Sequence, residues 1–304
     1  MRPILPARWS AVLLLLPALS CGVPAALAHH LDAAPASASE AEAITPDQVF
    51  AQAERIKADI LTIMAHHHIA PPPYHRRITV RLRPRHVWQK TYEILTKINI
   101  LRRKEHYPTL AVGTLDPTEE LLPGMVYDQT WRILTELHLI KMRLGLAARH
   151  PTPPPRPHHG KRPTDVYLLL DEVSSDLDAL NGAGFTPSDL FAQVMRLNGD
   201  IDAILRAMEL YDRSFPPPRQ PGAKPAEAMR AAVALLATTQ RLQRKLGLAT
   251  TDLARLVPPV VHPKDLFEMV GLIIAELQPV KYLLGLTDSR TPVTRRYRGK
   301  HPAD

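Results

Sequence analysis

The sequence predicts an all-α protein, a seven-helix repeat bundle of long amphipathic helices joined by Pro-rich connectors. Seven segments share a proline-led opening, at Pro46, Pro84, Pro123, Pro163, Pro187, Pro225 and Pro263. Counting each proline as position 0, positions 3, 4, 7, 10, 14 and 17 are apolar in 39 of 42 cases. If apolar residues were distributed evenly along the chain, the average apolar content of 45% would give roughly 19 apolar residues at these 42 positions. This spacing is typical of the buried seam of a helix that packs against other helices.

The openings indicate helix starts. Proline suits the first helical position, because its fixed φ is helical and its missing N–H would have no partner there. Thr45 with Gln48, and Thr186 with Asp189, match capping boxes. The sequence suggests no capping role for Arg162, Lys224 and His262, which stand where the threonines stand. The predicted helices cover residues 46–68, 84–105, 123–145, 163–181, 187–210, 225–246 and 263–285.

Connector length limits how the helices can be arranged. The fourth and fifth helices are joined by only a few residues, Asn181 to Thr186, which predicts antiparallel neighbours. The other connectors are long enough to run back along a helix, so parallel and antiparallel arrangements both remain open. Residues 77–83 alternate like a short strand, and residues 250–257 could form helical turns.

The chain divides into four predicted segments. Residues 1–28 form a signal peptide and residues 29–44 a disordered linker of Ala, Ser, Glu and Pro. Residues 45–286 form the helical repeat domain, either as one bundle or as two sub-bundles that meet at the 182–186 turn. Residues 287–304 form a basic C-terminal tail.

The leader predicts export. A basic start precedes the apolar segment 11–19, and Ala26-Leu27-Ala28 offers a cleavage site before His29. An alternative is a lipoprotein, because Ala18-Leu19-Ser20-Cys21 resembles a weak lipobox. We therefore expect a periplasmic or secreted protein, or one anchored to the membrane only through a lipid on Cys21.

Composition and motifs favour a binding protein over an enzyme. The formal net charge of +8 is modest for 304 residues and does not indicate nucleic-acid binding. The sequence contains no nucleophile elbow and no glycine-rich phosphate loop. We expect a scaffold, adaptor or sensor-like module with a protein partner in the cell envelope, and the sequence leaves its oligomeric state open.

The alternative function is histidine-based metal binding. His66, His67 and His68 end the first predicted helix, and His75 follows a proline run. Imidazole is a common ligand of Zn and Cu, so these four residues are the candidate metal site. The competing interpretation is that they interact with the helix dipole, because consecutive helical residues point about 100° apart. Apart from Zn or Cu, we expect no cofactor.

Four aromatic residues are candidates for a small ligand pocket. Trp88 and Tyr92 lie one turn apart in the second predicted helix, as do Tyr127 and Trp131 in the third. If these two helices pair, the four side chains would form one cluster. The competing interpretation is that they belong to the helix core.

The leader allows a direct test of export. We expect the mature chain isolated from the producing cell to begin at His29, as measured by intact-mass and N-terminal mass spectrometry. A lipid-modified N-terminal Cys21 would support the lipoprotein alternative, and a chain that still begins at Met1 would contradict cleavage at either site.

Overall fold

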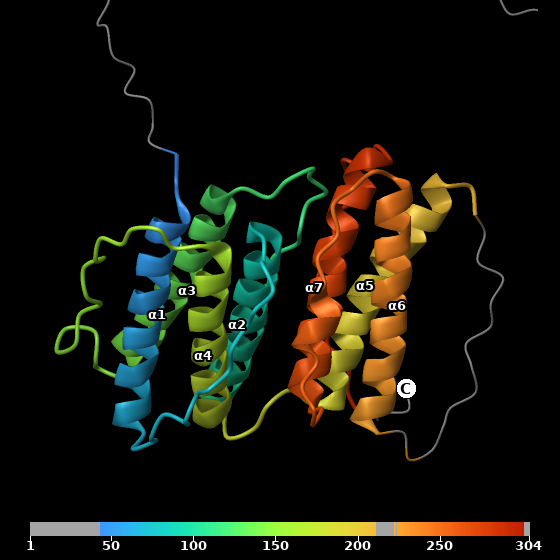
Figure 1. Ribbon diagram of the computed structural model, residues 1–304. Coiled ribbons are helices and arrows are strands. Elements are labelled where there is room, and N and C mark those ends of the chain that lie inside the picture. Colours follow the sequence, from blue (N-terminus) through green and yellow to red (C-terminus); the bar gives the residue numbers. More distant parts are fainter. Residues whose placement is uncertain (1–42, 211–221, 223, 301–304) are drawn as a thin grey trace, which may run out of the picture. The chain divides into compact units, whose positions relative to one another are not determined.

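The computed structural model describes residues 43–210, 222 and 224–300. The predicted signal peptide, Cys21 and the linker as far as residue 42 lie outside the described residues. The described secondary structure is entirely helical, which confirms the predicted all-α class (Figure 1). It comprises α1 (Pro46–His66), α2 (Pro84–Lys104), α3 (Pro123–Arg143), α4 (Pro163–Asn181), α5 (Pro187–Ala207), α6 (Pro225–Lys245), the 3₁₀ turn η1 (Leu253–Leu256) and α7 (Pro263–Leu283). No described helix has the length and apolar character needed to span a membrane.

Every helix starts at its proline, and six of the seven share one capping interaction. The backbone N–H of the residue before the proline donates to the side chain at position 2. The acceptors are Gln48, His86, Asp165, Asp189, Glu227 and Asp265. This half of a capping box needs no threonine, which explains why Arg162, Lys224 and His262 are tolerated before the proline.

The helices also end alike. Each is followed by a residue with positive φ, as in C-terminal motifs that satisfy the last carbonyl groups. These residues are His68, His106, Gly145, Gly182, Glu209, Gly247 and Gly285. Six of them lie at position 22, and α4 is shorter and ends at Gly182. The repeat therefore fixes both ends of the helices.

The helices pack in two groups, and within each group they run parallel. In the first bundle, α1 packs against α3 and α4, and α2 packs against α3 and α4. In the second, α7 packs against α5 and α6. The prolines that start α1 to α4 line one small hollow, and those that start α5 to α7 line another, so the helix starts gather at one end of each bundle. The described long connectors, 67–83, 105–122, 144–162 and 246–262, therefore return along the helices (Figure 1).

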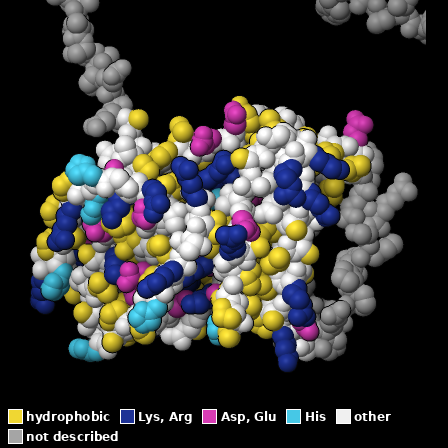
Figure 2. Space-filling model, in the orientation of Figure 1, with side chains coloured by type: hydrophobic (Ala, Val, Ile, Leu, Met, Phe, Trp, Pro, Cys, Tyr) yellow, Lys and Arg dark blue, Asp and Glu magenta, His cyan; other side chains and the backbone are white. Residues whose placement is uncertain are grey.

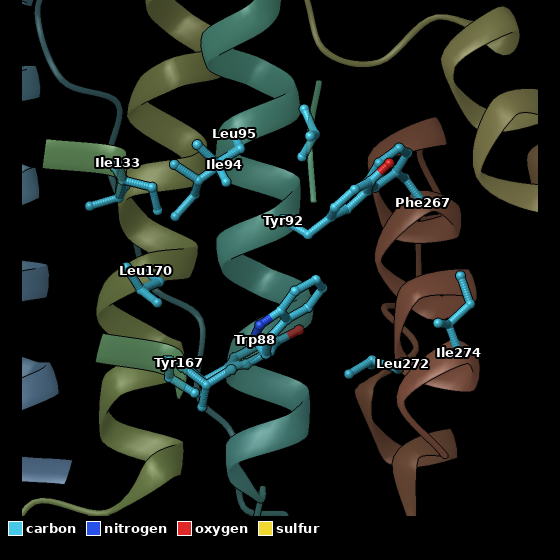
Figure 3. Packing of buried hydrophobic residues seen from close by; sticks show 14 of the residues in the cluster. Trp88, Tyr92, Ile94, Leu95, Ile133, Tyr167, Leu170, Phe267, Leu272 and Ile274 are labelled. Carbon is cyan, nitrogen blue, oxygen red and sulfur yellow. The ribbon is translucent and has the colours of Figure 1, made fainter. Parts of the chain in front are cut away.

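The bundles meet where α2 packs against α7, and these two helices are antiparallel. Arg85 near the start of α2 contacts Glu276 late in α7, whereas Tyr92 further along α2 stacks on Phe267 early in α7. Figure 3 shows Tyr92 of α2 directed toward Phe267 of α7. Most of α7 is buried because it contacts helices of both bundles.

Two expectations about the connectors are wrong. The fourth and fifth helices are antiparallel, as expected, but they are not packing neighbours, since α4 packs on α1 and α2 while α5 packs on α7. The short connection between them leads from one bundle into the other. Residues 77–83 form no strand, because Leu82 N–H donates to the Thr164 hydroxyl of α4 and not to a neighbouring strand.

The predicted basic tail follows a connector path in its described part, residues 287–300. Arg196 Nε donates to the carbonyl oxygen of Pro292 at 2.9 Å, as Arg55 Nε donates to that of Pro153 at 2.9 Å. A Cβ atom on Gly199 would lie 2.6 Å from Pro292 Cγ. The tail is thus packed tightly against α5, as the connector 144–162 is packed against α1.

The helix ends generate a stability prediction. His106 follows α2 with φ of 59°, a conformation that costs a non-glycine residue about 1 kcal/mol. We expect His106→Gly to raise the free energy of unfolding by about 1 kcal/mol, measured by urea denaturation. Gly247→Ala, at the matching position after α6, should lower it by a similar amount. A stabilising Gly247→Ala would contradict the explanation.

Candidate functional site

Polar pairs that are buried or partly buried link neighbouring helices of the first bundle at one repeated level. The side chain at position 18 of one helix donates to position 13 of the next. Lys141 Nζ of α3 donates to Asp59 of α1 at 2.5 Å, and Arg102 of α2 to Glu136 of α3 at 2.5 Å. Asn181 of α4 donates to the backbone carbonyl of residue 97 in α2 at 3.1 Å. These hydrogen bonds run from α3 to α1, from α2 to α3 and from α4 to α2. They therefore join the four helices along three sides of a ring.

The second bundle repeats two of these sides. Lys281 Nζ of α7 donates to Asp200 of α5 at 2.5 Å, and Gln243 Nε2 of α6 donates to Glu276 of α7 at 2.6 Å. By this correspondence α5, α6 and α7 take the places of α1, α2 and α3. Among the described residues, no helix takes the place of α4.

The ring leaves one acid of the first bundle without a partner. Asp176 stands at position 13 of α4, and its donor would come from position 18 of α1, where Met64 stands. The Oδ2 atom of Asp176 is buried without a hydrogen-bond partner among the described residues. Burial raises the pKa of this carboxyl group to about 6, and Lys57 offsets only part of that effect. An unpaired buried carboxylate costs stability when it ionises.

A charged network fills the interface between the bundles. Lys90 Nζ of α2 lies 2.8 Å from Asp171 of α4 and 3.5 Å from Glu268 of α7. Arg76, in the connector before α2, contacts the same two acids at 3.0 and 2.9 Å. Although burial favours the neutral amine, these acids and Glu93 hold the pKa of Lys90 well above its ordinary value.

Glu276 is the second polar centre of this interface. Its Oε1 accepts from Arg85 Nη2 at 2.8 Å and from His86 Nε2 at 2.7 Å. The other ring nitrogen of His86 accepts the N–H of Arg83, so its proton lies on Nε2. Although burial opposes it, donation from His86 and Arg85 lowers the pKa of Glu276 to about 2. These contacts fix α2 against α7.

A hollow of about 250 Å³ lies beside the charged network, and Tyr74, His75 and Arg76 line part of it. Five of its charged side chains, Arg76, Glu93, Asp171, Asp178 and Glu268, already form ion pairs. Tyr74 also donates to Asp171 at 2.8 Å, and Lys97 lies 2.8 Å from Asp178. This hollow therefore has the character of a structural ion-pair network.

An apolar groove lies on the second bundle, where the missing helix would pack. Its volume is about 310 Å³. Every side chain that lines it is apolar. Leu190, Phe191, Val194 and Leu197 come from α5, Ala228, Ala231, Ala232 and Leu235 from α6, and Leu266, Val270 and Ile273 from α7, together with the three starting prolines. Figure 2 shows hydrophobic side chains over the part of α6 seen in that view, with Lys and Arg gathered near both of its ends.

In the first bundle, the side chains at the matching positions are buried. At positions 3, 7, 14 and 18 of α1, each side chain is at most 3% exposed. In α5 the position 7 side chain, Val194, is 41% exposed, and Leu190, Ile201 and Leu205 are only partly buried. The same helix face is therefore covered in one bundle and open in the other.

The structure does not gather the histidines proposed to bind Zn or Cu into one group. No group of three or more His, Cys, Asp or Glu side chains in the described part of the chain could hold a metal ion. The His66 and His67 rings lie 5.2 Å apart near the end of α1, and His75 lines the polar hollow. Zn or Cu binding by these four histidines therefore stays a prediction.

The four candidate pocket aromatics form two separate pairs. Trp88 stacks on Tyr92, and Tyr92 stacks on Phe267 of α7, each with ring centroids 6.4 Å apart. Tyr127 contacts Trp131 edge-on and accepts a hydrogen bond from Gln52 of α1. Although α2 and α3 pack together, these side chains face different neighbours and are not brought together as one pocket.

Sequence reasoning missed the groove. Its residues belong to the repeated apolar seam, which predicts a buried core at every copy. The number of predicted helices was a signal that could have revealed the groove. If four of the seven helices close one bundle, only three remain for a second bundle. No protein-family model matches this chain, and comparison with curated proteins and with solved structures gives no match.

The unpaired Asp176 generates a pH prediction. Its folded pKa of about 6 lies above the ordinary value of about 4, so its favourable neutral form is fully present below pH 4 and is lost as pH rises through 6. We expect Asp176→Asn to be more stable than the natural chain by about 1 kcal/mol at pH 7.5, and by less at pH 4.5, in urea denaturation. Asp128→Asn, at an exposed position of α3, is the control. An advantage that does not grow with pH would rule out the assigned titration.

Proposed function

We propose that this protein is exported to the cell envelope and acts there by binding a protein partner, as a scaffold, adaptor or sensor-like module. Export is supported by the basic start, apolar segment and Ala26-Leu27-Ala28 site of the leader. Binding is supported by the apolar groove of the second bundle, and this single observation carries the proposal. Exposed apolar surfaces of this kind are typical of interaction sites.

The groove has the features of a preformed docking surface. It is lined from three helices whose ends are fixed by proline and by positive-φ residues, and α7 holds it against the first bundle. A partner would therefore meet a surface whose backbone is already ordered, which reduces the entropic cost of association. The side of α6 toward the groove carries alanines, which let another backbone approach closely.

Site-specific photocrosslinking in the producing cells tests this proposal. We expect a benzophenone amino acid at position 194, in the groove, to give a crosslinked adduct with another protein of the cell envelope. The control is the same amino acid at position 142 of α3, where Met142 is 58% exposed in the first bundle. Adducts at neither position, or equal adducts at both, would contradict a role for the groove.

A further inference from the structure

We infer that the groove accepts one amphipathic helix of the partner, acidic on its outer side, which lies parallel to α5 and α6 in the place that α4 takes in the first bundle. This inference rests on the proposed function and adds the chemistry and direction of the partner. Four observations lead to it.

The first observation is the place itself. In the first bundle α4 packs against both α1 and α2 and completes the ring. The pairs Lys141–Asp59 and Lys281–Asp200 align α1 with α5 and α3 with α7 in the same register. The open face between α5 and α6 therefore has the geometry of the face that α4 covers.

The second observation concerns the apolar seam. The α4 side chains at positions 3, 7, 10, 14 and 17 are at most 1% exposed; they are Val166, Leu170, Val173, Leu177 and Leu180. The groove offers apolar side chains over the first three of these levels, from Leu190 at position 3 to Leu235 at position 10. A helix with the repeated apolar spacing would bury both surfaces, as in other helix-in-groove complexes.

The third observation is a stripe of small side chains. At positions 6, 9 and 13, α2 faces α4 with Lys90, Glu93 and Lys97, all buried in ion pairs. The same positions of α6 carry Ala231, Ala234 and Thr238, which are exposed. The partner helix therefore needs no buried acids against α6, and it can place larger apolar side chains there.

The fourth observation is charge. In α6 the exposed cations Arg230, Arg241, Arg244 and Lys245 outnumber the one acid, Glu227. An acidic helix would be attracted to this rim, and the attraction would speed its association at low salt.

One of these cations also specifies direction. Lys104 at position 20 of α2 donates from Nζ to the Leu180 carbonyl oxygen at the end of α4, at 3.0 Å. Lys245 stands at position 20 of α6 and is exposed. It can bind the carbonyl groups at the end of a helix that runs parallel to α6, where a cation is favoured by the helix dipole.

A second copy of this chain fits the groove less well. Its own acidic helix, α4, already has its apolar seam buried inside the first bundle. A second copy would therefore have to dock through another surface. If that surface were its own groove, the exposed cations beside the two grooves would repel each other.

Peptide binding to the mature full chain tests the inference. The probe is an acetylated, fluorescent peptide of residues 162–182 in which alanine replaces Asp171 and Asp178. In α4 these two acids pair with Lys90 and Lys97 of α2, and α6 has Ala231 and Thr238 in the places of these lysines. We expect one peptide to bind per chain, and fluorescence anisotropy to report at least tenfold weaker binding to Val194→Glu. Met142→Glu, on the first bundle, should bind like the natural chain, and circular dichroism should show that both variants keep their helices.

A second peptide tests charge. Lysine at positions 168, 175 and 179 of the peptide, on the side opposite its apolar seam, should weaken binding at least tenfold at low salt relative to glutamate at the same positions. Equal or tighter binding of this peptide would overturn the acidic preference, although the groove would still be a docking site. For direction, a spin label at the start of the peptide should broaden NMR signals near Pro225 and not those near Lys245; the reverse would overturn the parallel orientation.

The remaining outcomes separate the two proposals. No peptide binding up to about 1 mM, together with a crosslinked adduct at position 194, would overturn the helix but not the proposed function. A dimer that Val194→Glu abolishes in sedimentation would make a second copy the occupant. Tighter peptide binding to a chain that begins at Ala43 than to one that begins at His29 would identify residues 29–42 as the occupant. Each of the last two results would overturn the inference.

Discussion

The hydrogen bond from position 18 of one helix to position 13 of the next determines the arrangement of the whole protein. An apolar seam alone allows neighbouring helices to run in either direction and to slide by a turn. A buried lysine must meet its aspartate at one register, because an uncompensated buried charge costs about 3 to 5 kcal/mol. The pairs Lys141–Asp59 and Lys281–Asp200 therefore make the helices parallel and align them, and they do so in both bundles.

Much of the fold could be predicted from the sequence because it depends on local chemistry. Each proline marks a helix start, and the apolar spacing identifies the helices. The direction and the neighbours of the helices could not be predicted in this way. Long connectors permit both directions, and since all seven seams are alike, no seam identifies its partner. Asp59, Asp200, Lys141 and Lys281 stand at matching positions, so aligning the copies by polar residues would have revealed the pairing.

The candidate site depends on tertiary structure to a greater degree. Lys90 and Lys97 lie on a helix face that a sequence pattern assigns to solvent, yet α4 covers this face and the bundles meet beside it. Val194 belongs to a seam that the pattern assigns to the core, yet it is exposed because the second bundle has three described helices. In both cases burial depends on how many helices surround a position, and local spacing does not contain that number.

The parallel arrangement also affects how the chain can fold. In the first bundle α1 packs on α3 and α4 but not along its neighbour in sequence, α2, so Asp59 must find Lys141 across 82 residues. Such non-local contacts give a high contact order, which slows folding. The first bundle can close only when α4 is available to complete the ring. A chain emerging from the ribosome would therefore stay open until about residue 181 has been synthesised, which delays the closure of the first bundle until more than half of the chain exists.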